Sequence, residues 1–301
     1  MRISTVPRLT RPRLALAGAS VAIAGTLLGA GLAGSATAAT ASGHTPSASA
    51  STAPKPTIVL VHGAWANSSS WNAVVEQLQA LGYTVDAPPN PLRGVSSDSA
   101  YLADFLSTIS GPIVLVGHSY GGFVITNAAT GNTQVKALVY DDAFIPAPGD
   151  TTHSLTAAKP GSCLAVADPS TVLNFVPFPG ATSGDQDAYV KQSVFPGCFT
   201  NGLPAFEGAA LAAEQQPLAL SALSALPTAS DDKLTTAPAW QTIPSWAVIG
   251  TNDKVIPPAE QLAMAQRAGA HITEISAPHL SMISDPGAVT RVILNAARTA
   301  G

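Results

Sequence analysis

The chain has 301 residues, 46% of them hydrophobic and 11% charged, and a formal net charge of −4 at pH 7. Four of its 14 basic residues are arginines near the start, so the rest of the chain has ten basic and 18 acidic residues, a formal charge of −8. This acidic balance argues against nucleic acids and anionic membranes as partners.

Residues 1–38 are typical of a secretory signal peptide. A basic start is followed by an apolar run over residues 14–34 and by a small-residue cleavage site, Ala36-Thr37-Ala38. A membrane anchor is the alternative, since about 20 apolar residues can span a bilayer. The Ala/Gly-rich run is only weakly hydrophobic, which favours the cleaved signal. There is no Arg-Arg pair, so we expect Sec-type export to the extracellular medium, without stable membrane association after cleavage.

Residues 39–56 are rich in Ser, Thr, Ala and Pro and are expected to form a flexible linker, because this composition cannot bury a core. Residues 57–301, about 245 in number, are enough for one larger domain.

Apolar runs and helical spacing alternate along this domain. The first run, residues 57–61, is continuous and β-branched, which is typical of a strand buried on both faces. The expected strands cover residues 57–61, 83–85, 112–116, 135–140, 245–249 and 271–275, and the expected helices cover 71–81, 97–109, 258–268 and 286–298, with a further helix after residue 121. Ser97 or Asp98 is expected to cap the second helix. This alternation predicts an α/β fold, a mostly parallel sheet of about six strands with helices on both faces.

Residues 145–242 interrupt the alternation. They are rich in Pro, Gly, Phe and Ala, include both cysteines and have few long periodic stretches. We interpret them as a cap inserted over the carboxyl ends of the strands, where open α/β sheets place their sites. The phenylalanines in or beside the cap predict an apolar pocket: Phe144, Phe175, Phe178, Phe195, Phe199 and Phe206.

The run Gly117-His118-Ser119-Tyr120-Gly121 matches the G-x-S-x-G nucleophile elbow. It follows a buried strand and precedes a helical stretch, which is the context that the motif requires. Small residues on both sides of the serine allow a sharp turn, which exposes the hydroxyl at the positive end of the following helix. We therefore predict that Ser119 is a nucleophile.

A serine hydroxyl needs a base to take its proton. Of the six histidines, His279 lies on the loop after the last expected strand, where this fold delivers its base. His62 and His118 lie beside glycines in two turns near the site, where we expect a packing or hydrogen-bonding role.

Two aspartates are candidates for the acid that must orient the imidazole of the histidine. Asp253 follows the fifth expected strand and Asp142 follows the fourth. We favour Asp253, because it keeps the chain order Ser, acid, His, and keep Asp142 as the alternative acid. The developing oxyanion also needs donors, for which we choose the backbone N–H groups of Tyr120 and Ala64.

Cys163 and Cys198 are the only cysteines. In an exported protein such a pair predicts a disulfide rather than two buried thiols. The histidines are scattered and no H-E-x-x-H run occurs, so no metal site is expected. The glycine-rich segments spell neither a Walker loop nor G-x-G-x-x-G after a strand, so no cofactor is expected.

These motifs resemble those of the compact α/β-hydrolases, in the group that contains plant methylesterases, hydroxynitrile lyases and bacterial esterase-like relatives. The resemblance extends over most of residues 57–298 and is carried by residues 59–65, 71, 78–83, 117–122 and 250–257. It implies an α/β-hydrolase fold and a triad of Ser119, Asp253 and His279, with Ala64 and Tyr120 at the oxyanion hole.

The lyases of this group depart from the chain at two positions. They carry a threonine and a lysine where this sequence has Gly63 and Leu280, which favours ester hydrolysis over cyanohydrin cleavage. We therefore expect a secreted serine hydrolase that cleaves small-molecule carboxylic esters through an acyl-enzyme intermediate. Lactone opening, amide hydrolysis or perhydrolysis on the same triad is one alternative. A non-catalytic binding protein on the same scaffold is the other, and the complete triad argues against it.

Overall fold

The computed structural model describes residues 54–181, 184–223 and 237–300. The predicted signal peptide and residues 39–53 of the predicted linker lie outside the described residues, and residues 54–56 have no regular secondary structure. None of the described helices combines the length and the apolar character that a membrane span requires.

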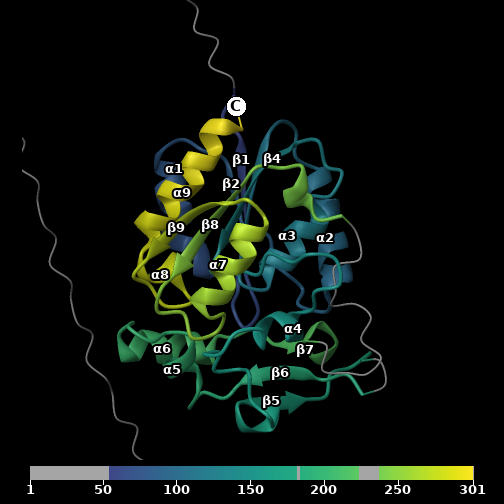
Figure 1. The fold of residues 1–301 in the computed structure, drawn as a ribbon, viewed down its shortest axis with the longest axis vertical. Coiled ribbons are helices and arrows are strands. Elements are labelled where there is room, and N and C mark those ends of the chain that lie inside the picture. Colours follow the sequence, from purple (N-terminus) through teal and green to yellow (C-terminus); the bar gives the residue numbers. More distant parts are fainter. Residues whose placement is uncertain (1–53, 182–183, 224–236, 301) are drawn as a thin grey trace, which may run out of the picture. The chain divides into compact units, whose positions relative to one another are not determined.

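Six parallel strands form the central sheet, in the order β2-β1-β3-β4-β8-β9 (Figure 1). They are β1 (Thr57–Val61), β2 (Val85–Asp86), β3 (Ile113–His118), β4 (Val135–Asp141), β8 (Ser245–Gly250) and β9 (His271–Ile275). Every residue of β3 and β8 is buried, as their continuous apolar runs predict, whereas the edge strand β9 is largely exposed. The fold prediction is confirmed, although β2 is only two residues long.

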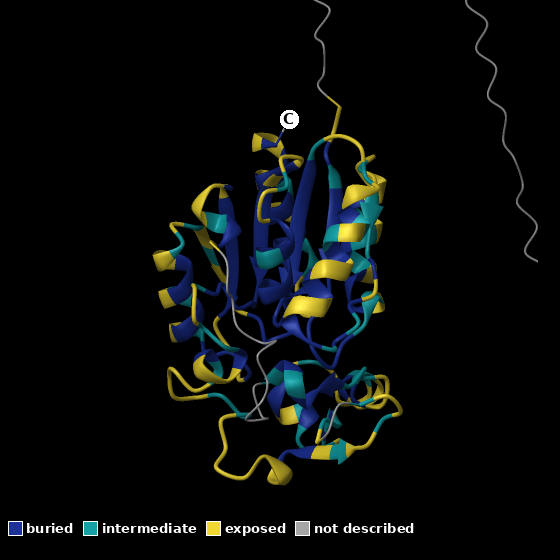
Figure 2. Cartoon of the chain, turned by 90° about the vertical axis from the view of Figure 1, so that its right-hand side faces the viewer, coloured by how far each residue is buried: buried dark blue, intermediate teal, exposed yellow. Residues whose placement is uncertain are grey.

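Helices cover both faces of this sheet (Figure 1). On one face α1 (Asn72–Ala80) packs against α9 (Pro286–Thr299), and on the other α2 (Val95–Ser107) packs against α3 (Gly121–Ala128). Two further helices, α7 (Pro258–Arg267) and α8 (Ser281–Ser284), follow β8 and β9. The sheet and the inner faces of the helices are buried, and the outer faces are exposed (Figure 2).

The helix α2 begins earlier than its sequence pattern predicts. Its N-cap is Gly94, so the prediction that Ser97 or Asp98 caps this helix is wrong. The carboxylate of Asp98 instead accepts backbone N–H groups from Arg93 and Gly94, just before the helix, which lets the helix start two residues sooner.

The segment between β4 and β8, which we call the cap segment (residues 145–242), contains a second sheet. Three antiparallel strands lie in the order β5-β6-β7, namely β5 (Leu173–Val176), β6 (Asp187–Val190) and β7 (Leu218–Ala219). Three short helices accompany them: α4 (Thr152–Thr156), α5 (Phe195–Cys198) and α6 (Ala205–Ala213). Figure 1 shows these elements gathered at the end of the central sheet from which the chain leaves β4. Buried residues alternate with half-buried ones along β6, which is typical of a sheet with only one packed face.

A disulfide joins Cys163 to Cys198 within the cap segment, with their Cα atoms 5.9 Å apart. The backbone N–H of Cys163 donates to the carbonyl oxygen of Lys254, at 2.7 Å. The disulfide is therefore fastened to the loop that follows β8.

Candidate active site

Ser119 occupies the sharp turn between β3 and α3. Its backbone is in the left-handed region, with φ of +53°, which a non-glycine residue rarely adopts. A Cβ atom at Gly117 would lie 2.7 Å from the carbonyl oxygen of Gly121, and one at Gly121 would lie 2.8 Å from that of Val61. The turn therefore closes only because both flanking positions lack a side chain.

The structure brings the predicted serine, histidine and aspartate together. The Ser119 hydroxyl donates to Nε2 of His279 at 2.9 Å, and Nδ1–H of His279 donates to Oδ2 of Asp253 at 2.7 Å. These three residues come from three different strand ends and are 5%, 0% and 5% exposed, respectively. The geometry is that of a nucleophile, a base and an orienting acid.

The hydrogen bonds of Asp253 fit an ionised carboxylate. Its Oδ1 accepts the backbone N–H groups of Val255 at 2.7 Å and of Ile256 at 3.1 Å. Its Oδ2 accepts from Nε2 of Gln261 at 2.7 Å, in addition to the histidine. Donors on both oxygens favour the charged form, which is the form that stabilises an imidazolium. No sequence signal pointed to Gln261, because its role depends on how α7 packs.

Asp142, the alternative acid, has no hydrogen bond to His279, whose Nδ1 is bonded to Asp253. Its Oδ1 accepts the backbone N–H of Gly250 at 2.6 Å, and its own backbone has φ of +44°. Burial, together with the charges of Asp141 and Asp253, raises the pKa of Asp142 well above its usual range. Because the hydrogen bond of Asp142 goes to the backbone of Gly250, this side chain does not orient the imidazole.

Asp141 lies beside this group, at the end of β4. Its Oδ1 accepts the hydroxyl of Ser281 at 2.7 Å, two residues beyond His279. Burial raises the pKa of Asp141 to about 7, partly offset by the Ser281 hydroxyl.

Two buried histidines fix the loops around the nucleophile. Nε2 of His62 accepts the backbone N–H of Asn90 at 2.9 Å, and its Nδ1–H donates to the carbonyl oxygen of Gly63 at 2.9 Å. Burial lowers the pKa of His62 to about 4, so the ring is neutral at pH 7. Nε2–H of His118 donates to the carbonyl oxygen of His279 at 2.9 Å, and burial holds its pKa well below the usual value. Both have the hydrogen-bonding role that their sequence context predicts.

A cavity of about 300 Å³ opens onto Ser119. The predicted oxyanion residues Ala64 and Tyr120 both line it. Most of the other lining side chains are apolar: Trp65, Phe144, Leu164, Leu173, Phe175, Leu218, Leu220, Leu223 and Val255. The polar ones come from the cap segment: Thr152, His153, Thr156, Asp168 and Ser170. The expected apolar pocket is therefore present beside the nucleophile.

The six phenylalanines that predicted this pocket have different places. Phe144 and Phe175 line the cavity, and Phe199 packs edge-on against the ring of His279, with centroids 5.5 Å apart. Phe206 is 79% exposed and contributes nothing to the pocket. In the part of the chain that the structure describes, no three His, Cys, Asp or Glu side chains are grouped so as to hold a metal ion.

The fold and this site define the class of protein. The model of the alpha/beta hydrolase family matches residues 58–292, and the chain belongs to that family.

Two of its relatives are named an esterase and a hydrolase. The chain is 34% identical over 110 residues to the carbendazim hydrolyzing esterase of Nocardioides sp., which covers 32% of this chain and 46% of that esterase. It is 36% identical over 108 residues to the pyrethroid hydrolase of Sphingobium wenxiniae, covering 31% of this chain and 38% of that hydrolase. The chain thus matches less than half the length of each of these two relatives.

The likeness to solved structures extends over more of the chain. The crystal structure of polyneuridine aldehyde esterase aligns with a TM-score of 0.66 at 18% sequence identity, covering 80% of this chain and 99% of that one. At this identity the match supports the shared fold alone.

Proposed function

We propose that this protein is a serine hydrolase that cleaves small, apolar carboxylic esters. The observation that carries the proposal is the unbroken chain of hydrogen bonds from Ser119 through His279 to Asp253, with Ser119 lining an apolar cavity. The family membership supports it, as do the two relatives that are named a carbendazim hydrolyzing esterase and a pyrethroid hydrolase.

The reaction proceeds in two halves. His279 takes the hydroxyl proton as Ser119 attacks the ester carbonyl, and the ionised Asp253 stabilises the resulting imidazolium. The backbone N–H groups of Ala64 and Tyr120 stabilise the negative charge on the carbonyl oxygen. The imidazolium then gives its proton to the leaving alcohol, which leaves an acyl group on the serine. Water, activated by the same histidine, releases the acid.

The cavity favours an uncharged acyl group of modest size. Its volume is at the lower end of the roughly 300–1,000 Å³ range of small-molecule sites. Among the described lining residues the only carboxylate is Asp168, and no lysine or arginine is present to pair with an anionic substrate. Burial of apolar acyl atoms against the leucine and phenylalanine side chains supplies the binding energy.

Hydrolysis is favoured over cyanohydrin cleavage by the packing around Gly63. A Cβ atom at this position would lie 2.6 Å from the Cβ atom of Ser119, so a threonine would displace the nucleophile. Leu280, which follows the histidine, is 3% exposed and offers no charged group for a cyanide ion.

The test replaces the nucleophile. Ser119→Ala should lower kcat for nitrophenyl esters about 10³-fold or more, because the covalent step is lost, and should abolish labelling by a fluorophosphonate probe. Ser107→Ala, at an exposed position on α2, is the matched control and should keep wild-type rates. Substantial ester turnover by a folded Ser119→Ala protein would refute the serine mechanism. A screen of nitrophenyl esters of graded chain length, with lactone and amide controls, then identifies the preferred bond.

A further inference from the structure

The two walls of the cavity belong to different parts of the chain. Tyr120, on the nucleophile turn, and Trp65, on the loop after β1, form one wall, whereas Leu173 and Leu218 belong to the cap segment. The width of the cavity therefore depends on how the cap segment is held against the nucleophile turn.

Asp98 connects the nucleophile turn to the loop before α2. It is 1% exposed and lies in the first turn of α2. Its Oδ2 accepts the phenolic hydroxyl of Tyr120 at 2.8 Å, and its Oδ1 accepts the backbone N–H of Arg93 at 3.0 Å. Burial raises the pKa of Asp98 above its usual value, and these hydrogen bonds offset only part of the rise. The side chain of Asp98 thus links the nucleophile turn to the loop before α2 by hydrogen bonds. No disulfide joins these two segments.

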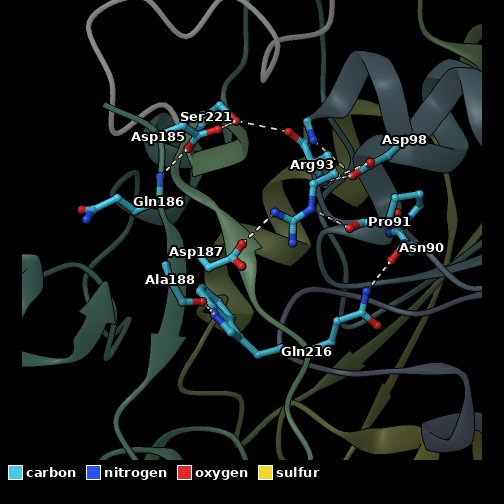
Figure 3. Close-up of polar contacts among 12 residues, drawn as sticks. Asn90, Pro91, Arg93, Asp98, Asp185, Gln186, Asp187, Ala188, Gln216 and Ser221 are labelled. Atoms are coloured by element: carbon cyan, nitrogen blue, oxygen red, sulfur yellow. Dashed lines mark hydrogen bonds and ion pairs between the residues drawn. The ribbon is translucent and has the colours of Figure 1, made fainter. Parts of the chain in front are cut away.

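Arg93 carries the connection into the cap segment (Figure 3). Its Nη1 donates to Oδ1 of Asp187, on β6, at 2.7 Å. Its carbonyl oxygen accepts the hydroxyl of Ser221 at 3.1 Å, and Ser221 is itself held by Asp185 at 2.9 Å. Both the side chain and the backbone carbonyl of Arg93 therefore bind the loop before α2 to the cap segment.

Other bonds along the same seam do not pass through Asp98. Nε1–H of Trp65 donates to the carbonyl oxygen of Ala188 at 2.8 Å, and Nε2–H of Gln216 donates to that of Asn90 at 3.1 Å. These bonds dock the cap segment against the loops after β1 and β2, whereas the path through Asp98 connects it to Tyr120, the residue that follows the nucleophile.

We propose that Asp98 is a positioning residue that couples the cap segment to the nucleophile turn through Tyr120 on one side and Arg93 and Asp187 on the other, and so sets how large an acyl group the cavity accepts. The inference rests on the proposed ester hydrolysis. Asp98 acts through its neighbours and does not itself contact the reacting atoms.

The experiment is a double-mutant cycle at the two ends of this path. Tyr120→Phe removes the hydroxyl and keeps the backbone N–H, and Asp187→Asn removes the charge that faces Arg93. Each single variant should lower kcat/KM for nitrophenyl octanoate about three- to tenfold more than it lowers kcat/KM for nitrophenyl acetate. The double variant should lose no more than the more impaired of the two single variants, because either substitution already breaks the path through Asp98.

Asp104→Asn, at an exposed position on the same helix, is the control and should match the wild type. Losses that multiply in the double variant, or equal losses on both esters, would overturn the proposal. Asp98→Asn should show the same selective loss of kcat/KM for nitrophenyl octanoate. If this variant does not fold, the cycle of Tyr120→Phe and Asp187→Asn still tests the proposal.

A second measurement is independent of turnover. Tyr120→Phe should speed amide hydrogen exchange in β6, which lies in the cap segment, and unchanged exchange there would overturn the coupling. If the wild type hydrolyses neither ester, the proposed function fails, and the exchange experiment alone still tests whether the nucleophile turn and the cap segment are coupled.

Discussion

Three buried carboxyl groups lie behind His279 at the ends of β4 and β8, and their hydrogen bonds distinguish them. Asp253 accepts from the imidazole, Asp141 accepts from Ser281, and Asp142 accepts from the backbone of Gly250. Three negative charges this close would repel one another, and burial raises the pKa of Asp141 to about 7 and that of Asp142 well above its usual range. Of the three carboxyl groups, Asp253 is the one that is hydrogen-bonded to the imidazole.

Replacement of the acid tests this division of roles. Asp253→Asn should lower kcat on one ester by about 10⁴-fold, because the amide favours the wrong imidazole tautomer. Asp142→Asn should have a much milder effect, since an amide oxygen can still accept the N–H of Gly250. The reverse ranking would move the acid to β4, and equally severe losses would mean that both carboxyl groups serve His279.

The raised pKa of Asp141 predicts how this residue changes the free energy of unfolding with pH. Its folded pKa of about 7 lies above the unfolded value near 3.9, so unfolding releases a proton between these two pH values. The contribution of Asp141 to the free energy of unfolding should therefore fall as the pH rises from about 4 to 7. Asp141→Asn cannot ionise, so its stability relative to the wild type should rise over this window by on the order of 2–4 kcal/mol.

Urea unfolding at pH 4.5 and at pH 7 measures this difference, with the exposed Asp104→Asn as the control. Stability curves of Asp141→Asn and wild type that run parallel with pH would contradict a neutral Asp141.

At the scale of the elements, the disulfide joins two parts of the cap segment that both reach the active site. Cys163 donates its N–H to Lys254, the neighbour of Asp253, and Cys198 precedes Phe199, which packs on His279. The disulfide therefore supports both the loop that carries Asp253 and the packing of Phe199 against His279.

Loss of this bond should destabilise the cap segment more than the central sheet. The bridged residues are 35 apart in sequence, for which the chain-entropy model gives roughly 3–4 kcal/mol. Reduction should lower Tm and speed hydrogen exchange in β5–β7 before it does so in β3 and β4. The double variant Cys163→Ser, Cys198→Ser should show the same loss and no further change with reductant. Uniform exchange across both sheets would mean that the bond supports the whole fold.

At the scale of the whole molecule, we propose that the protein is exported and that residues 1–38 are removed. The basic start, the weakly hydrophobic run and the small-residue cleavage site support this proposal. The intact mass of protein recovered from the medium should correspond to a chain that begins near residue 39. Ala36→Glu together with Ala38→Glu should block this cleavage. Full-length protein that stays in the membrane fraction would instead support an anchor.

Local sequence patterns were enough to predict much of the molecule. The continuous apolar runs predicted β1, β3 and β8, because a strand buried on both faces needs little beyond β-branched and apolar side chains. The elbow could be found because Gly117 and Gly121, where a Cβ atom would clash, stand at a fixed spacing around Ser119 in the sequence. The cap segment was predicted as a cap over the carboxyl ends of the strands, but without its secondary structure. Its strands are short and depend on contacts with the central domain, so its three-stranded sheet left no clear pattern.

The sequence by itself determined the nucleophile turn and the positions from which a base and an acid could come. Only the tertiary structure decided that Asp253 rather than Asp142 reaches His279, because both follow buried strands and differ only in where their side chains point in space. The contacts of Gln261 and Asp98 were likewise decided by the packing of helices against loops far away in sequence. A hydrogen bond depends on distances of a few tenths of an ångström, and residue spacing along a chain does not set such distances across a fold.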